Sequence, residues 1–161
     1  MMSGEQPTVE ERLQSEFRHI KTSIYGVRGT VVATTDGFLV GHDVPGLDPT
    51  DLAALLAATC SLATRGIAAS GNGQFREAVS RGTQGFLAVY QAGSNAIVAI
   101  IGDAELNTAL LPYRVRDAVE RIASYTSEFS RWSGGPAQPS PPPVSDPSAG
   151  PTPLPIRRRY Y

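Results

Sequence analysis

The chain has 161 residues, of which 41% are hydrophobic, and its formal net charge is −1. This length predicts one domain, and the balanced charge excludes the strongly basic surface that typifies nucleic-acid-binding proteins. The single cysteine, Cys60, excludes an internal disulfide bond and a metal cluster built on cysteines. The polar, acidic residues 1–16 are unlike a signal peptide, and no apolar run approaches the roughly 20 residues that span a bilayer. We therefore expect a cytoplasmic protein without membrane insertion.

The N-terminal part of the chain predicts a flexible segment over residues 1–8 and then a helix from Val9. Thr8 is a suitable N-cap, and Glu11 follows it at the spacing of a capping box. The apolar positions that should face the core repeat at helical spacing: Val9, Leu13, Phe17 and Ile20. Two strands are then predicted over 29–34 and 38–42, because Asp36-Gly37 between them favours a hairpin turn.

The middle of the chain predicts a long helix that ends before Gly71. Asp48 is a suitable N-cap, and Pro49 suits the first helical position. Apolar spacing of three and four predicts a core-facing stripe: Leu52, Leu55, Leu56, Thr59, Leu62, Ala63 and Ile67. The opposite face carries small residues: Ala53, Ala54, Ala57, Ala58, Cys60, Ser61 and Ala68. Since no charge occurs between Asp51 and Arg65, where a surface helix normally has charges, we expect this helix to be covered on two sides.

Three more strands and a final helix follow. Residues 74–81 alternate weakly and carry charges on both faces, as an edge strand does. Residues 86–90 and 96–101 are apolar on both faces, so layers of helix must cover both sides of the sheet. The stripe predicted for the last helix is Leu106, Leu110, Tyr113, Val119, Ile122, Ala123 and Phe129. Pro112 leaves two alternatives, a helix that begins near Ala109 or a longer helix that is kinked at the proline.

The last 29 residues differ sharply in composition. Nine prolines occur in residues 133–161, and the chain ends in Arg157-Arg158-Arg159-Tyr160-Tyr161. We expect this segment to be disordered, with polyproline II character, because it cannot build a core. The folded domain is therefore predicted over residues 9–132. Its order is α-β-β-α-β-β-β-α, with a five-stranded antiparallel α+β sheet that has one helix on one face and two on the other.

This pattern resembles the roadblock/dynein light-chain family, and its actinobacterial members most of all. The resemblance rests on the segments 25–29 (Tyr-Gly-Val-Arg-Gly), 34–37 (Thr-Thr-Asp-Gly), 51–55 (Asp-Leu-Ala-Ala-Leu), 96–101 and 105–107. It covers roughly residues 9–129, and the sequence departs from the family in its proline-rich tail and in Pro112. The resemblance implies a homodimer that pairs its central helices and edge strands. It also implies a non-enzymatic partner of a small Ras-like GTPase, often encoded with that GTPase and a sensor kinase.

A search for catalytic residues favours a protein that is not an enzyme. His19 and His42 lack metal-ligand spacing, and no Gly-rich phosphate loop ending in Lys-Ser/Thr exists, so we expect no cofactor and no metal. Cys60 has no basic neighbour, and we interpret it as a packing residue. Three hypotheses remain, namely a homodimeric GTPase adaptor, a small-molecule-sensing or scaffold module of the same fold, and, least favoured, a small enzyme.

The candidate site residues follow from the first hypothesis. Small residues allow helices to approach closely, and the helix and edge strand give this candidate dimer interface: Ala53, Ala54, Ala57, Ala58, Ser61, Phe75 and Val79. Arg65 and Arg76 flank that region, and either could meet an acidic GTPase surface or assist hydrolysis. The plainer interpretation, solvated charges at a helix end and an edge strand, is favoured for both arginines.

Overall fold

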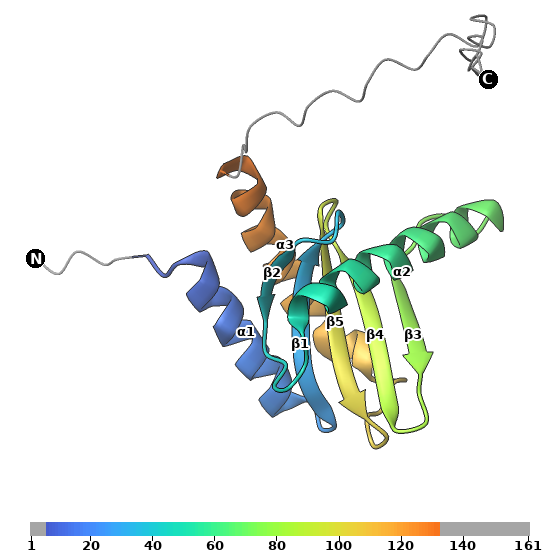
Figure 1. The fold of residues 1–161 in the computed structure, drawn as a ribbon, viewed down its shortest axis with the longest axis horizontal. Coiled ribbons are helices and arrows are strands. Elements are labelled where there is room, and N and C mark those ends of the chain that lie inside the picture. Colours follow the sequence, from blue (N-terminus) through green and yellow to red (C-terminus); the bar gives the residue numbers. More distant parts are fainter. Residues whose placement is uncertain (1–5, 133–161) are drawn as a thin grey trace, which may run out of the picture.

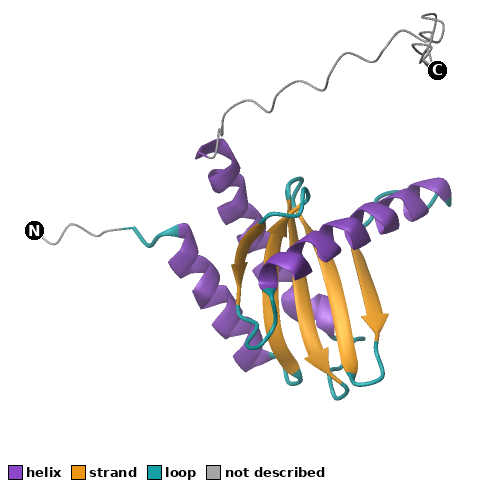
Figure 2. Ribbon diagram, in the orientation of Figure 1, coloured by secondary structure: helices purple, strands orange, loops and turns teal. Residues whose placement is uncertain are grey.

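A five-stranded antiparallel sheet forms the middle layer of the protein (Figures 1 and 2). This computed structural model describes residues 6–132, so most of the predicted N-terminal segment and the whole proline-rich tail lie outside the described residues. The elements in chain order are α1 (Val9–Ser23), β1 (Val27–Thr34), β2 (Leu39–His42), α2 (Pro49–Ala69), β3 (Glu77–Arg81), β4 (Gly85–Ala92), β5 (Ala96–Asp103) and α3 (Leu111–Trp132). The strands are arranged β2-β1-β5-β4-β3, which leaves β2 and β3 at the two edges. The predicted element order and fold class are confirmed.

Both predicted helix starts are confirmed by their capping contacts. The backbone N–H of Glu11 donates to Thr8 Oγ1 at 3.2 Å, and the Thr8 N–H donates to the Glu11 carboxylate at 2.8 Å. At the start of α2, the Asp48 carboxylate accepts from the Thr50 N–H at 2.8 Å and from the Asp51 N–H at 3.3 Å. These contacts satisfy amide groups that have no partner inside the helix.

Helix α3 resolves the alternatives that Pro112 left open. The helix begins at Leu111, so Pro112 lies in its first turn, where a missing N–H costs no intrahelical bond. Before it, the Asn107 side chain accepts from the N–H groups of Ala109 and Leu110, at 3.1 and 3.2 Å. The predicted stripe of this helix is wrong at its start, because Leu110 and Tyr113 are exposed. The side chains that α3 buries are instead Leu111, Val115, Ala118, Ile122 and Thr126.

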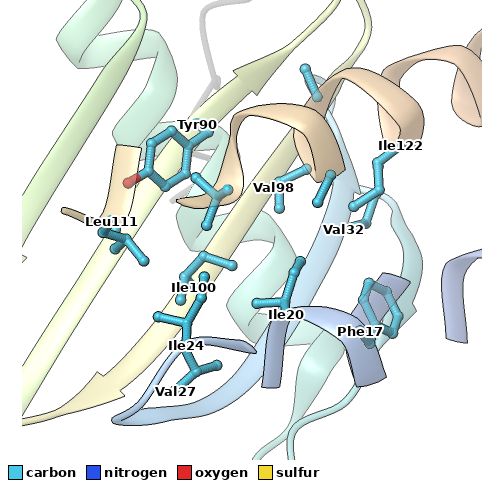
Figure 3. Packing of buried hydrophobic residues seen from close by; sticks show 14 of the residues in the cluster. Phe17, Ile20, Ile24, Val27, Val32, Tyr90, Val98, Ile100, Leu111 and Ile122 are labelled. Atoms are coloured by element: carbon cyan, nitrogen blue, oxygen red, sulfur yellow. The ribbon is translucent and has the colours of Figure 1, made fainter. Parts of the chain in front are cut away.

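Two hydrophobic clusters fill the spaces on the two faces of the sheet. The larger one joins α1 and α3 to the sheet through residues such as Phe17, Ile20, Val98 and Ile122 (Figure 3). The other lies between α2 and the sheet and contains Val31, Leu56, Cys60, Phe75, Val89 and Ile97. One helix therefore covers one face and two helices cover the other, as predicted.

The predicted core-facing stripe of α2 is confirmed for Leu52, Leu56, Ala63 and Ile67, and it is wrong for Leu55 and Leu62. The residues that α2 buries are Ala53, Leu56 and Cys60, whereas Leu55 and Leu62, predicted to face the core, are 64% and 70% exposed. The reason is that two neighbouring stripes along this helix, one through Leu55 and one through Leu56, have the same spacing of three and four, so spacing alone does not separate them. Ala53, Leu56 and Cys60 lie against the sheet, and Leu55 and Leu62 lie outward.

Candidate interaction surface on helix α2 and strand β3

The outward side of α2 is an apolar surface without charge. We define the α2 outer face as Ala54, Leu55, Ala58, Ser61 and Leu62, all of which are exposed. Leu55 and Leu62 lie seven residues apart, so they project from the same side of the helix two turns apart. In Figure 1, α2 crosses the sheet obliquely, and its C-terminal end projects past the edge strand β3. Exposed leucines in a patch bounded by polar residues are typical of an interaction surface.

The structure places the predicted interface residues of α2 in different environments. Ala54, Ala58 and Ser61 are exposed on the α2 outer face, and Ala57 is half-buried beside them. Ala53 has no exposed surface, so the prediction that it contacts a partner is wrong. Sequence reasoning did not identify Leu55 and Leu62 as surface residues, because their spacing also suits a stripe that faces the core. The absence of charge along the helix was the signal that either side could be apolar.

The two predicted interface residues around β3 also differ. Phe75 precedes the strand, which begins at Glu77 and not at residue 74, and it is buried in the cluster under α2. Phe75 is therefore a core residue and cannot line an interface. Val79 lies in the middle of β3 and is 43% exposed. Its register partner is Ala88, which belongs to the cluster on the α1 and α3 side, so Val79 lies on that face of the sheet.

Strand β3 presents an alternating charge pattern along the open edge of the sheet. Glu77 pairs with Tyr90 and Arg81 pairs with Phe86, which puts both charged residues on the same face as Val79. The Arg81 guanidinium lies 5.3 Å from the centroid of the Phe86 ring, where a cation–π contact holds it. The edge therefore presents an acidic residue, a valine and a basic residue in that order.

The two candidate partner-binding arginines are both on the surface. Arg65 is exposed near the C-terminal end of α2 and lines a cavity of about 380 Å³ together with Ser61, Thr64 and Gln91. Arg76 is exposed directly before β3, and its backbone carbonyl accepts from the Gln91 N–H at 3.0 Å. Gln91 is thus the residue that connects the two neighbourhoods: it lines the Arg65 cavity and bonds to the Arg76 backbone.

Cys60 has the environment of a packing residue. Its side chain is 4% exposed and donates to Gln91 Oε1 at 3.3 Å. Burial raises the pKa of the Cys60 thiol, so the reactive thiolate is scarce at neutral pH. Within residues 6–132, no three His, Cys, Asp or Glu side chains are placed to hold a metal ion.

Helix α2 also meets the length and hydropathy of a membrane span, with 21 residues and a mean hydropathy of 1.5 in its most apolar window. The expectation that no run of the chain approaches such a span is therefore wrong for α2. A single helix of this kind is weak evidence for a membrane span, and 22% of its most apolar window is buried within the protein, where Ala53, Leu56 and Cys60 pack on the sheet.

Comparisons with known proteins agree with this architecture. An uncharacterised protein of Methanocaldococcus jannaschii is 28% identical over 98 residues, which make up 60% of this chain and 85% of that protein. The gliding protein MglB from Thermus thermophilus superposes with a TM-score of 0.67 at 22% identity, over 77% of this chain and 95% of its own. The Roadblock/LC7 domain from Streptomyces avermitilis gives a TM-score of 0.64 at 24% identity, over 70% and 96% of the two chains. The Roadblock/LC7 domain family matches residues 21–102, more than half of the sequence, and the chain belongs to that family.

Proposed function

We propose that this protein is a non-enzymatic homodimeric adaptor or regulator of a small Ras-like GTPase in a bacterial, cytoplasmic signalling module. The observation that carries this proposal is the α2 outer face, where Leu55 and Leu62 are 64% and 70% exposed on a helix without charge from residue 52 to residue 64. Leaving two large leucines in water forgoes roughly 1.5–3 kcal/mol each. A surface that accepts this cost is best explained by a partner that covers it.

A second copy of the chain is the occupant that suits the α2 outer face. Ala54, Ala58 and Ser61 are small enough to let another helix approach closely, and the two leucines can fill the space between the helices. The C-terminal end of α2 already projects past β3 (Figure 1), toward the place that a second sheet would occupy. A stable dimer of this kind buries on the order of 1,200–2,000 Å².

The edge strand β3 gives the dimer a specific register. If two copies of β3 pair antiparallel about Val79, Glu77 of one protomer lies opposite Arg81 of the partner subunit, and the reverse pair forms by symmetry. Opposite charges directly across a strand pair are favourable, by roughly 0.2–1 kcal/mol each. The pairing would also satisfy the free amide and carbonyl groups of the edge and join two five-stranded sheets into one.

The GTPase as partner rests on family membership. Resemblance to the roadblock family implies binding to a Ras-like GTPase, and a sensor kinase encoded nearby is a further expected partner. Arg65 and Arg76 are both exposed, so each can contact an acidic group of a GTPase.

A second candidate function, small-molecule sensing, is favoured by one observation. The cavity beside Arg65 has a volume of about 380 Å³, and hydroxyl groups of Ser61, Thr64 and Ser94 line it. Ligand pockets typically occupy about 300–1,000 Å³. Native mass spectrometry of the protein purified from its own host would show a bound small molecule if this candidate were correct.

The GTPase proposal is tested by calorimetry with a small Ras-like GTPase from the same organism, chosen from the neighbouring genes where one is encoded there. The protein is titrated into the GTPase loaded with a GTP analogue and, separately, with GDP. We expect saturable binding to one or both forms, and no nucleotide turnover by this protein alone. Absence of binding to both forms, with both proteins folded, would refute the proposal. Binding that leaves the hydrolysis rate unchanged would identify an adaptor and exclude an activator.

A further inference from the structure

A second exposed apolar surface lies at the end of the molecule where α1 finishes and α3 starts. A cavity of about 220 Å³ opens there between Ile24, Tyr25, Glu105, Leu110, Leu111 and Arg114. Ile24 and Leu111 are buried and form its floor, and Figure 3 shows them at the same end of the larger cluster. This end belongs to the α1 and α3 side of the sheet, so the dimer proposed through α2 does not cover it.

Large side chains stand exposed around this cavity. Tyr25 is 79% exposed, Leu110 is 50% exposed, and Tyr113, on the adjoining turn, is 75% exposed. We call Tyr25, Leu110 and Tyr113 the tyrosine groove. Tyr25 and Leu110 line the cavity, and Tyr113 follows Leu110 by three residues at the start of α3. Exposed apolar side chains around a hollow are typical of an interaction site.

The groove is held in shape by its own polar contacts. The Tyr25 hydroxyl donates to the Glu105 carboxylate at 2.6 Å, and the Glu105 backbone N–H donates to Asp103 Oδ1 at 2.9 Å. The Tyr25 ring is therefore fixed at the mouth of the cavity. Arg114 lines the same cavity and supplies N–H donors.

These features together select a class of ligand. Shallow grooves lined by aromatic rings bind proline-rich segments, because proline rings pack flat on the aromatic faces. A polyproline II segment has no internal hydrogen bonds, so its carbonyl groups remain free to accept from a donor such as the Arg114 guanidinium. It is already extended before it binds, so little conformational entropy is lost.

We propose that the tyrosine groove binds the proline-rich segment 139–143 (Pro-Ser-Pro-Pro-Pro) of the same chain. The geometry allows this contact. Helix α3 places Leu111, beside the groove, about 31 Å from Trp132, since each helical residue advances 1.5 Å. A segment that advances about 3.1 Å per residue covers that distance in roughly 10 residues after Trp132, which brings the prolines at 141–143 to the groove. This contact is separate from the proposed GTPase function.

The test uses the full chain and two-dimensional ¹H–¹⁵N NMR. One variant replaces the prolines of the segment by alanine: Pro139, Pro141, Pro142 and Pro143. The matched control replaces an equal number of later prolines: Pro147, Pro151, Pro153 and Pro155. We expect the first variant to shift the amide signals of Tyr25, Glu105 and residues 110–114 and to leave those of α2 in place. The control should shift neither set.

Two further measurements make the assignment specific. In a Tyr25→Ala/Tyr113→Ala background, which leaves the core intact because both side chains are exposed, the proline variant should no longer shift the groove signals. Phe38→Ala, which removes another exposed aromatic side chain, is the control background. In that background the proline variant should still shift the groove signals. Identical groove signals in the wild type and the first variant would overturn the proposal. Groove signals that change on tenfold dilution would also overturn it, because they would show that the segment of another copy is bound.

Discussion

At the scale of single residues, the Glu16–Arg121 ion pair joins α1 to α3. The Arg121 Nε and Nη2 groups donate to the two carboxylate oxygens of Glu16, at 2.6 and 2.9 Å, and the Tyr125 hydroxyl lies 3.5 Å from the same carboxylate. The hydrogen bond to Glu16 raises the pKa of Arg121, so the guanidinium stays charged at any working pH. The Glu16 side chain is 10% exposed, so this carboxylate depends on Arg121 for compensation.

We predict that Arg121→Ala lowers the free energy of unfolding by about 1–3 kcal/mol, because it leaves a buried carboxylate without its main partner. The Arg121 side chain is 43% exposed, and solvent screening keeps the effect out of the range of a fully buried pair. Arg116→Ala, an exposed arginine on the same helix, is the matched control and should change stability by less than about 0.5 kcal/mol. Urea denaturation measures both, and equal effects of the two substitutions would contradict this account.

Among the elements, α2 is the one on whose exposed side the proposed dimer depends. We predict that Ala58→Arg and Leu62→Glu each dissociate the dimer, because each puts an unpaired charge into an apolar contact. The dissociation constant should rise by roughly 100-fold or more, which corresponds to about 2.7 kcal/mol. Analytical ultracentrifugation measures it. Leu110→Glu, another half-exposed leucine, should leave the dimer intact, and dissociation by that control would show that the effect is not specific to α2.

Strand β3 makes a separate prediction through its charges. Glu77→Arg should weaken the dimer, because it puts two arginines opposite each other in the register centred on Val79. Adding Arg81→Glu in the same chain should restore the affinity, since the opposite charges then face each other again. The dissociation constants of the single and double variants decide this. A double variant that is no tighter than the single one would contradict this register.

The elements also show what the sequence could predict. Caps such as Thr8 and Asp48 were predicted correctly because they depend on residues three positions apart. The core-facing stripe of α2 was predicted too broad, because Leu55 and Leu56 belong to two stripes of equal spacing and an alanine-rich helix lacks the charges that distinguish them. The apolar stripe predicted for α3 starts too early in the sequence, because the first residue of this helix depends on Asn107 and Pro112 together.

For the candidate interaction surface, the sequence singled out helix α2 as a whole more clearly than the individual residues on its exposed side. The uncharged helix predicts that α2 is covered on two sides. One side packs on the sheet, and Ala54, Ala58 and Ser61 lie on the exposed side, where a covering partner stays a prediction. No local pattern predicts the exposure of Tyr25, because that exposure depends on how the end of α1 and the start of α3 pack beside the sheet. Such a contact between distant segments has no local pattern.

At the scale of the whole molecule, both hydrophobic clusters form within residues 6–132. We predict that removal of residues 134–161 leaves the thermal unfolding midpoint nearly unchanged. A tethered segment whose effective concentration equals its dissociation constant stabilises the folded state by only about 0.4 kcal/mol. Differential scanning calorimetry of the two chains measures the difference. A drop of many degrees would show that the removed residues form part of the core.

Assembly of two chains through α2 and β3 is tested by the molar mass of the protein in solution. Light scattering on the purified protein at micromolar concentration should give twice the 17.1 kDa of one chain. The Leu62→Glu variant, measured in the same way, should give the mass of one chain. A wild-type mass of 17.1 kDa at that concentration would contradict the account, because the α2 outer face would then remain in water without a second copy to cover it.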